Sequence, residues 1–193
     1  MIHANGSPDD VEIATAAARA GADMVRDLYG RRLTRIDKGA DDFATAADVE
    51  AEKSILGVIR AARPDDAVLG EEGGRRGGAD AGRLWLVDPL CGTLNYAVGS
   101  MLVAVNVALR DGAAAVADPF SGVVFFTDGE TARVRRDGDD TPLAPTSATA
   151  LVDVNLDGID GAPIGVAGRE LVAAADAETH ASLMSMIRGR GHA

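Results

Sequence analysis

The chain has 193 residues, of which 47% are hydrophobic and 25% charged, enough for one globular domain with a sizeable core. A net charge of −11 with scattered arginine pairs argues against a nucleic-acid-binding protein. No apolar run approaches the roughly 20 residues of a membrane helix, no signal peptide is visible, and the single cysteine excludes an internal disulfide. We therefore expect a cytoplasmic protein that binds neither nucleic acid nor membranes.

Two helices are predicted in the first third of the chain. Ser7 can cap the first of them, whose apolar residues recur at helical spacing over residues 11–30. The second is predicted over residues 46–62, with Ile55 on its inner face, and Pro64 ends it.

Short strands are predicted in the middle of the chain. Between them, the Gly- and Arg-rich residues 73–82 are expected to form a mobile surface loop. No domain linker is visible, so residues 1–193 are interpreted as a single domain that closes with a helix at 177–188. The predicted strands are residues 67–70, 84–88, 101–110, 113–117, 122–127, 131–135 and 170–175.

Acidic residues fall where these strands and helices are expected to meet. They are Asp48, the pair Glu71-Glu72 and Asp88, and carboxylates at strand ends can converge on one cleft. Mg²⁺ prefers oxygen ligands and keeps several waters, so Glu71, Asp88 and the carbonyl of Leu90 would supply a modest set of ligands. The alternative interpretation is that these acids are ordinary surface charges.

The pair Gly92-Thr93 follows the last of these acids. A glycine before Thr-Leu-Asn-Tyr can open a short helix whose free N–H groups bind phosphate. Thr93 could also position a water molecule for attack on phosphorus if a carboxylate such as Asp48 accepts its proton. An ordinary turn and cap is the alternative.

Three segments carry a resemblance to the inositol monophosphatase family. They are ATAADVEAEKSI (44–55), VLGEEGG (68–74) and WLVDPLCGTLNYAVG (85–99). Their order and spacing are similar to the family's Thr-x-x-Asp helix start, its Gly-Glu-Glu and its Asp-Pro-x-Asp-Gly-Thr-x-Asn-Phe, most clearly over residues 8–130. The resemblance implies an α+β fold, a layered α/β sandwich, with Mg²⁺-dependent hydrolysis of a small phosphorylated polyol or sugar, and a homodimer.

The resemblance also assigns roles by position. Glu71 and Asp88 match metal ligands, with the Leu90 carbonyl as a third. Asp48 and Thr93 match the pair that activates the attacking water. Gly92 and Thr93 match the phosphate-binding residues, and Cys91 stands at a position near the substrate hydroxyls.

Two departures from the family pattern bear on activity. Cys91 replaces an aspartate that binds a second metal ion, and a thiol is a poor partner for Mg²⁺, though acceptable to Zn²⁺. One Mg²⁺ site is therefore expected, with the second weakly held. The family's later Trp-Asp motif is also missing, so a second sheet layer is expected to be largely absent before a closing strand and helix at residues 168–188.

Three hypotheses about function follow from these observations. The first is a phosphomonoesterase of reduced activity. The second is a catalytically degenerate member with a non-hydrolytic binding, partner or biosynthetic role, since apolar surface uncovered by a missing layer favours association. The third, covalent catalysis by Cys91, is the weakest, because the Cys-x5-Arg arrangement would need arginine where Ala97 stands.

Overall fold

The structure is a computed structural model that describes residues 9–31, 35–39, 42–78, 81–143, 155–156 and 170–171. Its contacts divide the chain into two units, Met1–Leu143 and Ala144–Ala193. In the second unit, β11 (Asn155–Leu156) and β12 (Glu170–Leu171) form a two-stranded antiparallel sheet. The remainder of the strand predicted over 170–175 and the helix predicted over 177–188 lie outside the described residues.

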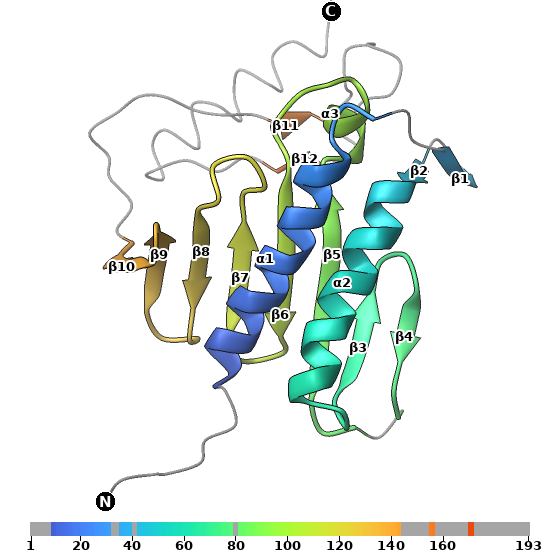
Figure 1. Cartoon of the computed structure of the whole chain (residues 1–193). Coiled ribbons are helices and arrows are strands. Elements are labelled where there is room, and N and C mark those ends of the chain that lie inside the picture. The colour runs from blue at the N-terminus through green and yellow to red at the C-terminus, as the bar shows by residue number, and fades with distance from the viewer. Residues whose placement is uncertain are drawn as a thin grey trace, which may run out of the picture. The chain divides into compact units, whose positions relative to one another are not determined.

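An eight-stranded mixed sheet forms the body of the first unit (Figure 1). The strand order is β10-β9-β8-β7-β6-β5-β3-β4, and only β3 and β5 run parallel. The strands are β3 (Ala67–Gly70), β4 (Gly74–Arg76), β5 (Leu84–Cys91), β6 (Ala104–Leu109), β7 (Ala114–Ala117), β8 (Val124–Thr127), β9 (Ala132–Arg136) and β10 (Asp139–Pro142).

These strands confirm most of the predicted ones, with shifted ends. The strand at 67–70 is confirmed residue for residue, and the one at 84–88 extends to Cys91. The prediction of a mobile loop over 73–82 was wrong in part, because residues 74–76 pair with β3 as an edge strand. The glycine-rich composition favours a loop, but it does not show whether the backbone of residues 74–76 meets a neighbouring strand with which it can pair, and here β3 is that strand.

Two helices cover one face of the sheet, α1 (Asp10–Leu28) and α2 (Ala46–Ala62) (Figure 1). The predicted bounds of α2 are confirmed. The predicted cap of α1 was wrong: Asp9 is the N-cap, and its Oδ1 accepts a hydrogen bond from the Glu12 amide at 2.8 Å. A carboxylate at this position satisfies a free N–H and also interacts favourably with the helix dipole.

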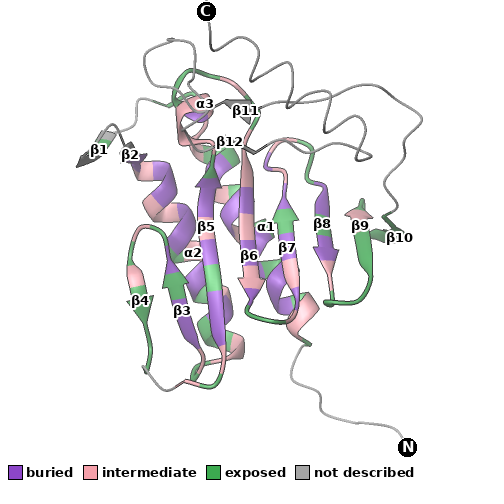
Figure 2. Cartoon of the chain, turned by 180° about the vertical axis from the view of Figure 1, so that it is seen from behind, coloured by how far each residue is buried: buried purple, intermediate pink, exposed green. Residues whose placement is uncertain are grey.

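Alternation along the strands divides the core from an open face. Val105, Val107 and Leu109 of β6 are buried against the helices, whereas alternate residues face the other side. Four large apolar side chains on that other side are 38–43% exposed: Leu69, Leu86, Val116 and Phe125. Figure 2 shows this face of the sheet, with exposed segments along β3, β5 and β7. No described helix of this unit covers them, so within residues 9–143 the layered fold is reduced to one helical layer on one sheet, as predicted.

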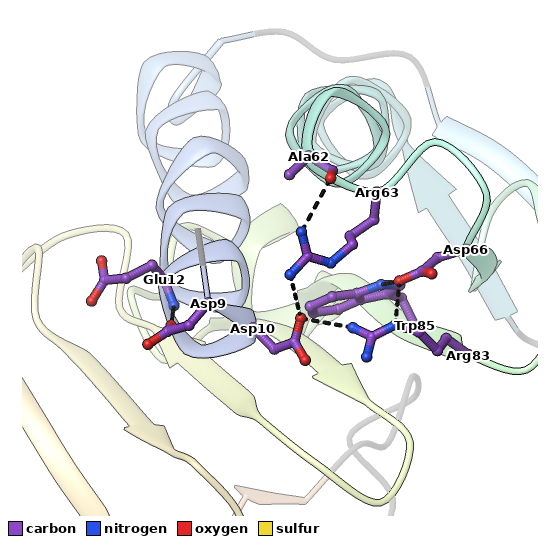
Figure 3. Close-up of polar contacts among 8 residues, drawn as sticks. All are labelled: Asp9, Asp10, Glu12, Ala62, Arg63, Asp66, Arg83 and Trp85. Carbon is purple, nitrogen blue, oxygen red and sulfur yellow. Dashed lines mark hydrogen bonds and ion pairs between the residues drawn. The ribbon is translucent and has the colours of Figure 1, made fainter. Parts of the chain in front are cut away.

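A polar cluster ties the helices to the starts of β3 and β5 (Figure 3). Asp10 Oδ1 pairs with Arg83 at 2.7 Å and with Arg63 at 3.0 Å. Asp66 Oδ2 accepts hydrogen bonds from Arg83 Nε at 3.0 Å and from Trp85 Nε1 at 2.8 Å. These contacts join α1, the end of α2 and both strands.

A short antiparallel pair of strands, β1 (Arg35–Gly39) and β2 (Asp42–Thr45), precedes α2. Among the described residues, no helix is long and apolar enough to span a membrane.

Candidate active site

Glu71 and Asp88 lie next to each other because each comes one residue after the last paired position, Gly70–Val87, of the parallel strands β3 and β5. Gly70 of β3 pairs with Val87 of β5, and the Glu71 amide donates a hydrogen bond to the Val87 carbonyl at 3.1 Å. Each carboxylate therefore sits one residue beyond a paired position. The structure thus brings together the two side chains that the sequence suggested as metal ligands.

The Asp88 carboxylate is poorly satisfied by its protein neighbours. Its Oδ2 accepts a hydrogen bond from Asn106 Nδ2 at 3.2 Å, and Asn106 is its partner across the β5–β6 ladder. Its Oδ1 is buried and has no hydrogen-bond partner among the described residues. Burial and the nearby Glu71 charge raise the pKa of Asp88 from 3.8 to about 6, against smaller effects of Asn106 and Cys91. A buried oxygen without a partner, beside a second carboxylate, is a place where a cation would lower the free energy.

Asp48 is held at the start of α2 by a capping box. It is 2% exposed, and its Oδ2 accepts hydrogen bonds from the amide (2.7 Å) and the hydroxyl (2.6 Å) of Thr45. Its Oδ1 accepts a hydrogen bond from Thr93 Oγ1 at 3.0 Å. Burial raises the pKa of Asp48, although the hydrogen bonds from Thr45 and Thr93 oppose the rise. The orientation of the carboxylate is therefore fixed, with one oxygen turned toward Thr93.

Thr93 connects Asp48 to the turn that follows Asp88. Besides Asp48, its hydroxyl lies within hydrogen-bond distance of the Leu90 carbonyl oxygen, at 3.1 Å. The hydroxyl has one proton, so these two acceptors compete for it. Asp48, Leu90 and Thr93 therefore form one contiguous group, built from α2, β5 and α3 (Thr93–Ala97).

Cys91 is the last residue of β5, and Gly92 connects it to α3. The β5–β6 register shifts between Asp88 and Cys91, and the Cys91 side chain is exposed. Gly92 has φ of +93°, a left-handed conformation in which a Cβ would lie 3.0 Å from the Leu102 carbonyl. Glycine is therefore required for the chain to turn from the strand into α3.

The donor set fits one Mg²⁺ better than a metal cluster. The described residues contain no group of three or more His, Cys, Asp or Glu side chains that could hold a metal ion. Two carboxylates and a backbone carbonyl are nevertheless hard oxygen ligands, and Mg²⁺ is commonly bound by one or two carboxylates with waters and substrate phosphate completing its shell. The unsatisfied Asp88 Oδ1 gives such an ion a ligand that is otherwise unused.

A hollow of about 560 Å³ on the open face of the sheet adjoins these carboxylates. Its lining includes Glu71, Asp88 and Asn106 together with the apolar side chains of Leu69, Leu86 and Val116. The volume is in the range of small-molecule sites.

Two contributors to this region were missed from the sequence. No sequence pattern indicated Asn106 as a neighbour of the site, because its position opposite Asp88 depends on the register of β6 on β5. Glu52 could have been recognised, because it lies four residues after Asp48 on the same helix face as Ile55 and Ile59. In the structure it is 2% exposed. An acid within an apolar stripe of a helix is the pattern that could have identified it.

Comparisons with known proteins agree with the resemblance noted in the sequence. The family model described as the inositol monophosphatase family matches residues 8–158. An inositol-1-monophosphatase of Caulobacter vibrioides is 38% identical over 120 residues, which are 58% of this chain and 46% of that protein. The Nus factor SuhB of Vibrio cholerae is 35% identical over 115 residues, or 57% of this chain and 43% of that protein.

Solved structures show the same fold. The suhB protein of Bartonella henselae matches with a TM-score of 0.58 and 30% identity, over 65% of this chain and 51% of that one. An IMPase of Thermotoga maritima matches with a TM-score of 0.61 and 23% identity, over 73% and 55%. The chain thus spans about half the length of the curated relatives it matches.

Proposed function

This chain belongs to the inositol monophosphatase family, and on that premise we propose that it hydrolyses a phosphomonoester of a small polyol or sugar. The observation that carries the proposal is the Thr93 hydroxyl, which lies 3.0 Å from Asp48 Oδ1 and 3.1 Å from the Leu90 carbonyl. Leu90 follows Asp88 by two residues in β5, so one strand connects this group to the Asp88–Glu71 pair. A proton acceptor and a set of candidate metal ligands are therefore linked through β5.

Glu71, Asp88 and the Leu90 carbonyl would hold one Mg²⁺ ion. When bound, the ion supplies positive charge that lowers the pKa of a ligated water and offsets the charge of the phosphoryl oxygens. Both carboxylates must be ionised to bind it. Because burial and Glu71 raise the pKa of Asp88 to about 6, protons compete with the ion in mildly acidic solution.

Thr93 and Asp48 would take the proton from the attacking water. The Thr93 oxygen accepts the proton of the water, and the Thr93 hydroxyl proton passes to Asp48 Oδ1. The other Asp48 oxygen is held by Thr45, so the carboxylate needs no rotation. Burial raises the pKa of Asp48 and makes it a better proton acceptor than an exposed aspartate.

Cys91, Gly92 and Thr93 are proposed to contact the substrate. Gly92 and Thr93 would contact the phosphate, and Cys91 would lie near the hydroxyls of the alcohol. A neutral thiol contributes no charge, so a second metal ion would be held weakly. Loss of its contribution could reduce the rate roughly 10³-fold if it were worth about 4 kcal/mol.

A second candidate function is a binding role without hydrolysis. It is favoured by the apolar side chains exposed on the open face of the sheet, since large apolar patches mark interfaces. Some relatives also carry the name Nus factor.

Three expectations from the sequence stay predictions: a homodimer, a cytoplasmic location and the absence of a nucleic-acid partner.

The deciding experiment is phosphate release from a panel of small phosphomonoesters, with Mg²⁺, Mn²⁺ and Zn²⁺ added separately. The unmodified protein is compared with Asp88→Asn and Cys91→Asp. Turnover that disappears in Asp88→Asn supports metal-dependent hydrolysis, and a gain in Cys91→Asp places the deficit at the thiol. If neither the unmodified protein nor Cys91→Asp releases phosphate, the hydrolytic proposal is wrong.

A further inference from the structure

Glu52 is a buried carboxylate that the proposed mechanism does not use. It lies on α2 one turn after Asp48 and is 2% exposed. Burying a carboxylate is unfavourable unless hydrogen bonds or an opposite charge compensate, so its contacts must account for it.

Glu52 contacts the turn between β3 and β4 and the last residue of β4. Its Oε2 accepts a hydrogen bond from the Glu72 amide at 2.8 Å, and its Oε1 lies 3.9 Å from Arg76 Nη2. The side chain of Arg76 is 43% exposed, so this ion pair contributes little on its own. The hydrogen bond from the backbone is therefore the principal contact.

Two glycines let the carboxylate enter this turn. A Cβ at Gly70 would lie 2.4 Å from Glu52 Oε2, and one at Gly73 would lie 2.5 Å from Glu52 Oε1. Any larger residue would displace either the turn or the carboxylate. The turn is thus wrapped closely around Glu52, with a glycine on each side of Glu71 and Glu72.

Glu71 is consequently fixed from two sides. Its own amide is held by the Val87 carbonyl of β5 at 3.1 Å, and the next amide is held by Glu52 at 2.8 Å. Gly70 meets Glu52 on the helix side of the sheet, whereas Glu71 lines the hollow of the open face together with Asp88.

We propose that Glu52 is a positioning residue that fixes the β3–β4 turn, so that the Glu71 carboxylate is held beside Asp88 for a divalent cation. The inference rests on the proposed function for the role of Glu71 as a ligand. Glu52 acts through the backbone of the turn and does not touch the ion. Contacts that orient metal ligands typically change affinity about 10- to 100-fold when they are removed.

The test measures Mn²⁺ binding by calorimetric titration of the purified protein, without substrate. Glu52→Ala removes the acceptor and should weaken Mn²⁺ binding about 10- to 100-fold. Glu52→Gln keeps an acceptor for the Glu72 amide and should recover part of that loss. Hydrogen exchange of the Glu72 amide should accelerate in the same order, with Glu52→Ala fastest.

Asp66→Ala is the matched control, because the Asp66 carboxylate is 9% exposed but Asp66 precedes β3, whereas the turn that Glu52 holds follows β3. It should lower the melting temperature and leave Mn²⁺ affinity unchanged. If Glu52→Ala does not fold, the comparison of Glu52→Gln with the control decides, with an expected loss of affinity of at least about 3-fold.

The outcomes separate the two proposals. Equal Mn²⁺ affinity in the unmodified protein and the Glu52 variants overturns the positioning role and leaves hydrolysis standing. A graded loss of affinity in a protein that releases no phosphate supports the positioning role and overturns hydrolysis. If the unmodified protein binds no Mn²⁺, both proposals fail.

Discussion

Asp88→Asn should stabilise the metal-free protein while it abolishes metal-dependent activity. The reason is that the ionised carboxylate is partly buried beside Glu71, and its buried Oδ1 has no hydrogen-bond partner among the described residues. Asparagine has nearly the same shape without the charge. The substitution therefore removes an electrostatic penalty that the folded protein carries when no cation is bound.

The size of the gain follows from the pKa of Asp88. A rise from 3.8 in the unfolded chain to about 6 in the fold corresponds to at most about 3 kcal/mol at a pH above both values. The new amide group must find its own hydrogen-bond partners, which offsets part of this gain. We therefore expect a net gain of about 1–2 kcal/mol, or roughly 2–8 °C in melting temperature for a chain of this size.

The pH dependence gives the sharper check. Because folding raises this pKa, the penalty is absent below about pH 3.8, grows as the pH rises, and is complete above about pH 6. Urea unfolding with EDTA should show Asp88→Asn more stable than the unmodified protein at pH 8 and nearly equal to it at pH 4. Added Mg²⁺ should stabilise only the unmodified protein. An Asp88→Asn variant that is less stable at pH 8 in EDTA would refute the reasoning.

The other predictions concern Thr93, two glycines and Asp66. Thr93→Val should reduce phosphate release about 10²-fold or more with Mn²⁺ affinity retained, because it removes only the hydroxyl that passes the proton to its acceptor; a calorimetric Kd that weakens in parallel would contradict this. Gly57→Ala should stabilise the protein by about 0.5–1 kcal/mol, since nothing lies within 4 Å of the added methyl group. Gly21→Ala should instead destabilise it by about 1–3 kcal/mol, because its methyl group would meet a side chain at 2.7 Å, and urea denaturation measures both. Asp66→Ala should cost about 1–3 kcal/mol in the same assay, because it leaves the buried Trp85 Nε1 without its acceptor. An unchanged free energy of unfolding would contradict this.

The sequence alone was sufficient wherever neighbouring residues decide the outcome. The bounds of α2 follow from apolar periodicity between the Thr45 cap and Pro64, and β3 follows from a short apolar run that ends in glycine. The resemblance to the inositol monophosphatase family, carried by three short segments, is confirmed by the match over residues 8–158. The pairing of Asp48 with Thr45 was also within reach, because a capping box is a contact over three residues.

Tertiary structure decided the contacts between distant segments. That β4 is a strand depends on β3 being available as a partner, and Asn106 faces Asp88 because of the register of β6 on β5. Glu52 can be recognised as an acid on an apolar face, but only the folded chain shows that it holds the Glu72 amide 20 residues away. The physical reason is the same in each case: local patterns report the preference of a segment for helix or strand, whereas register and burial depend on which partner that segment meets.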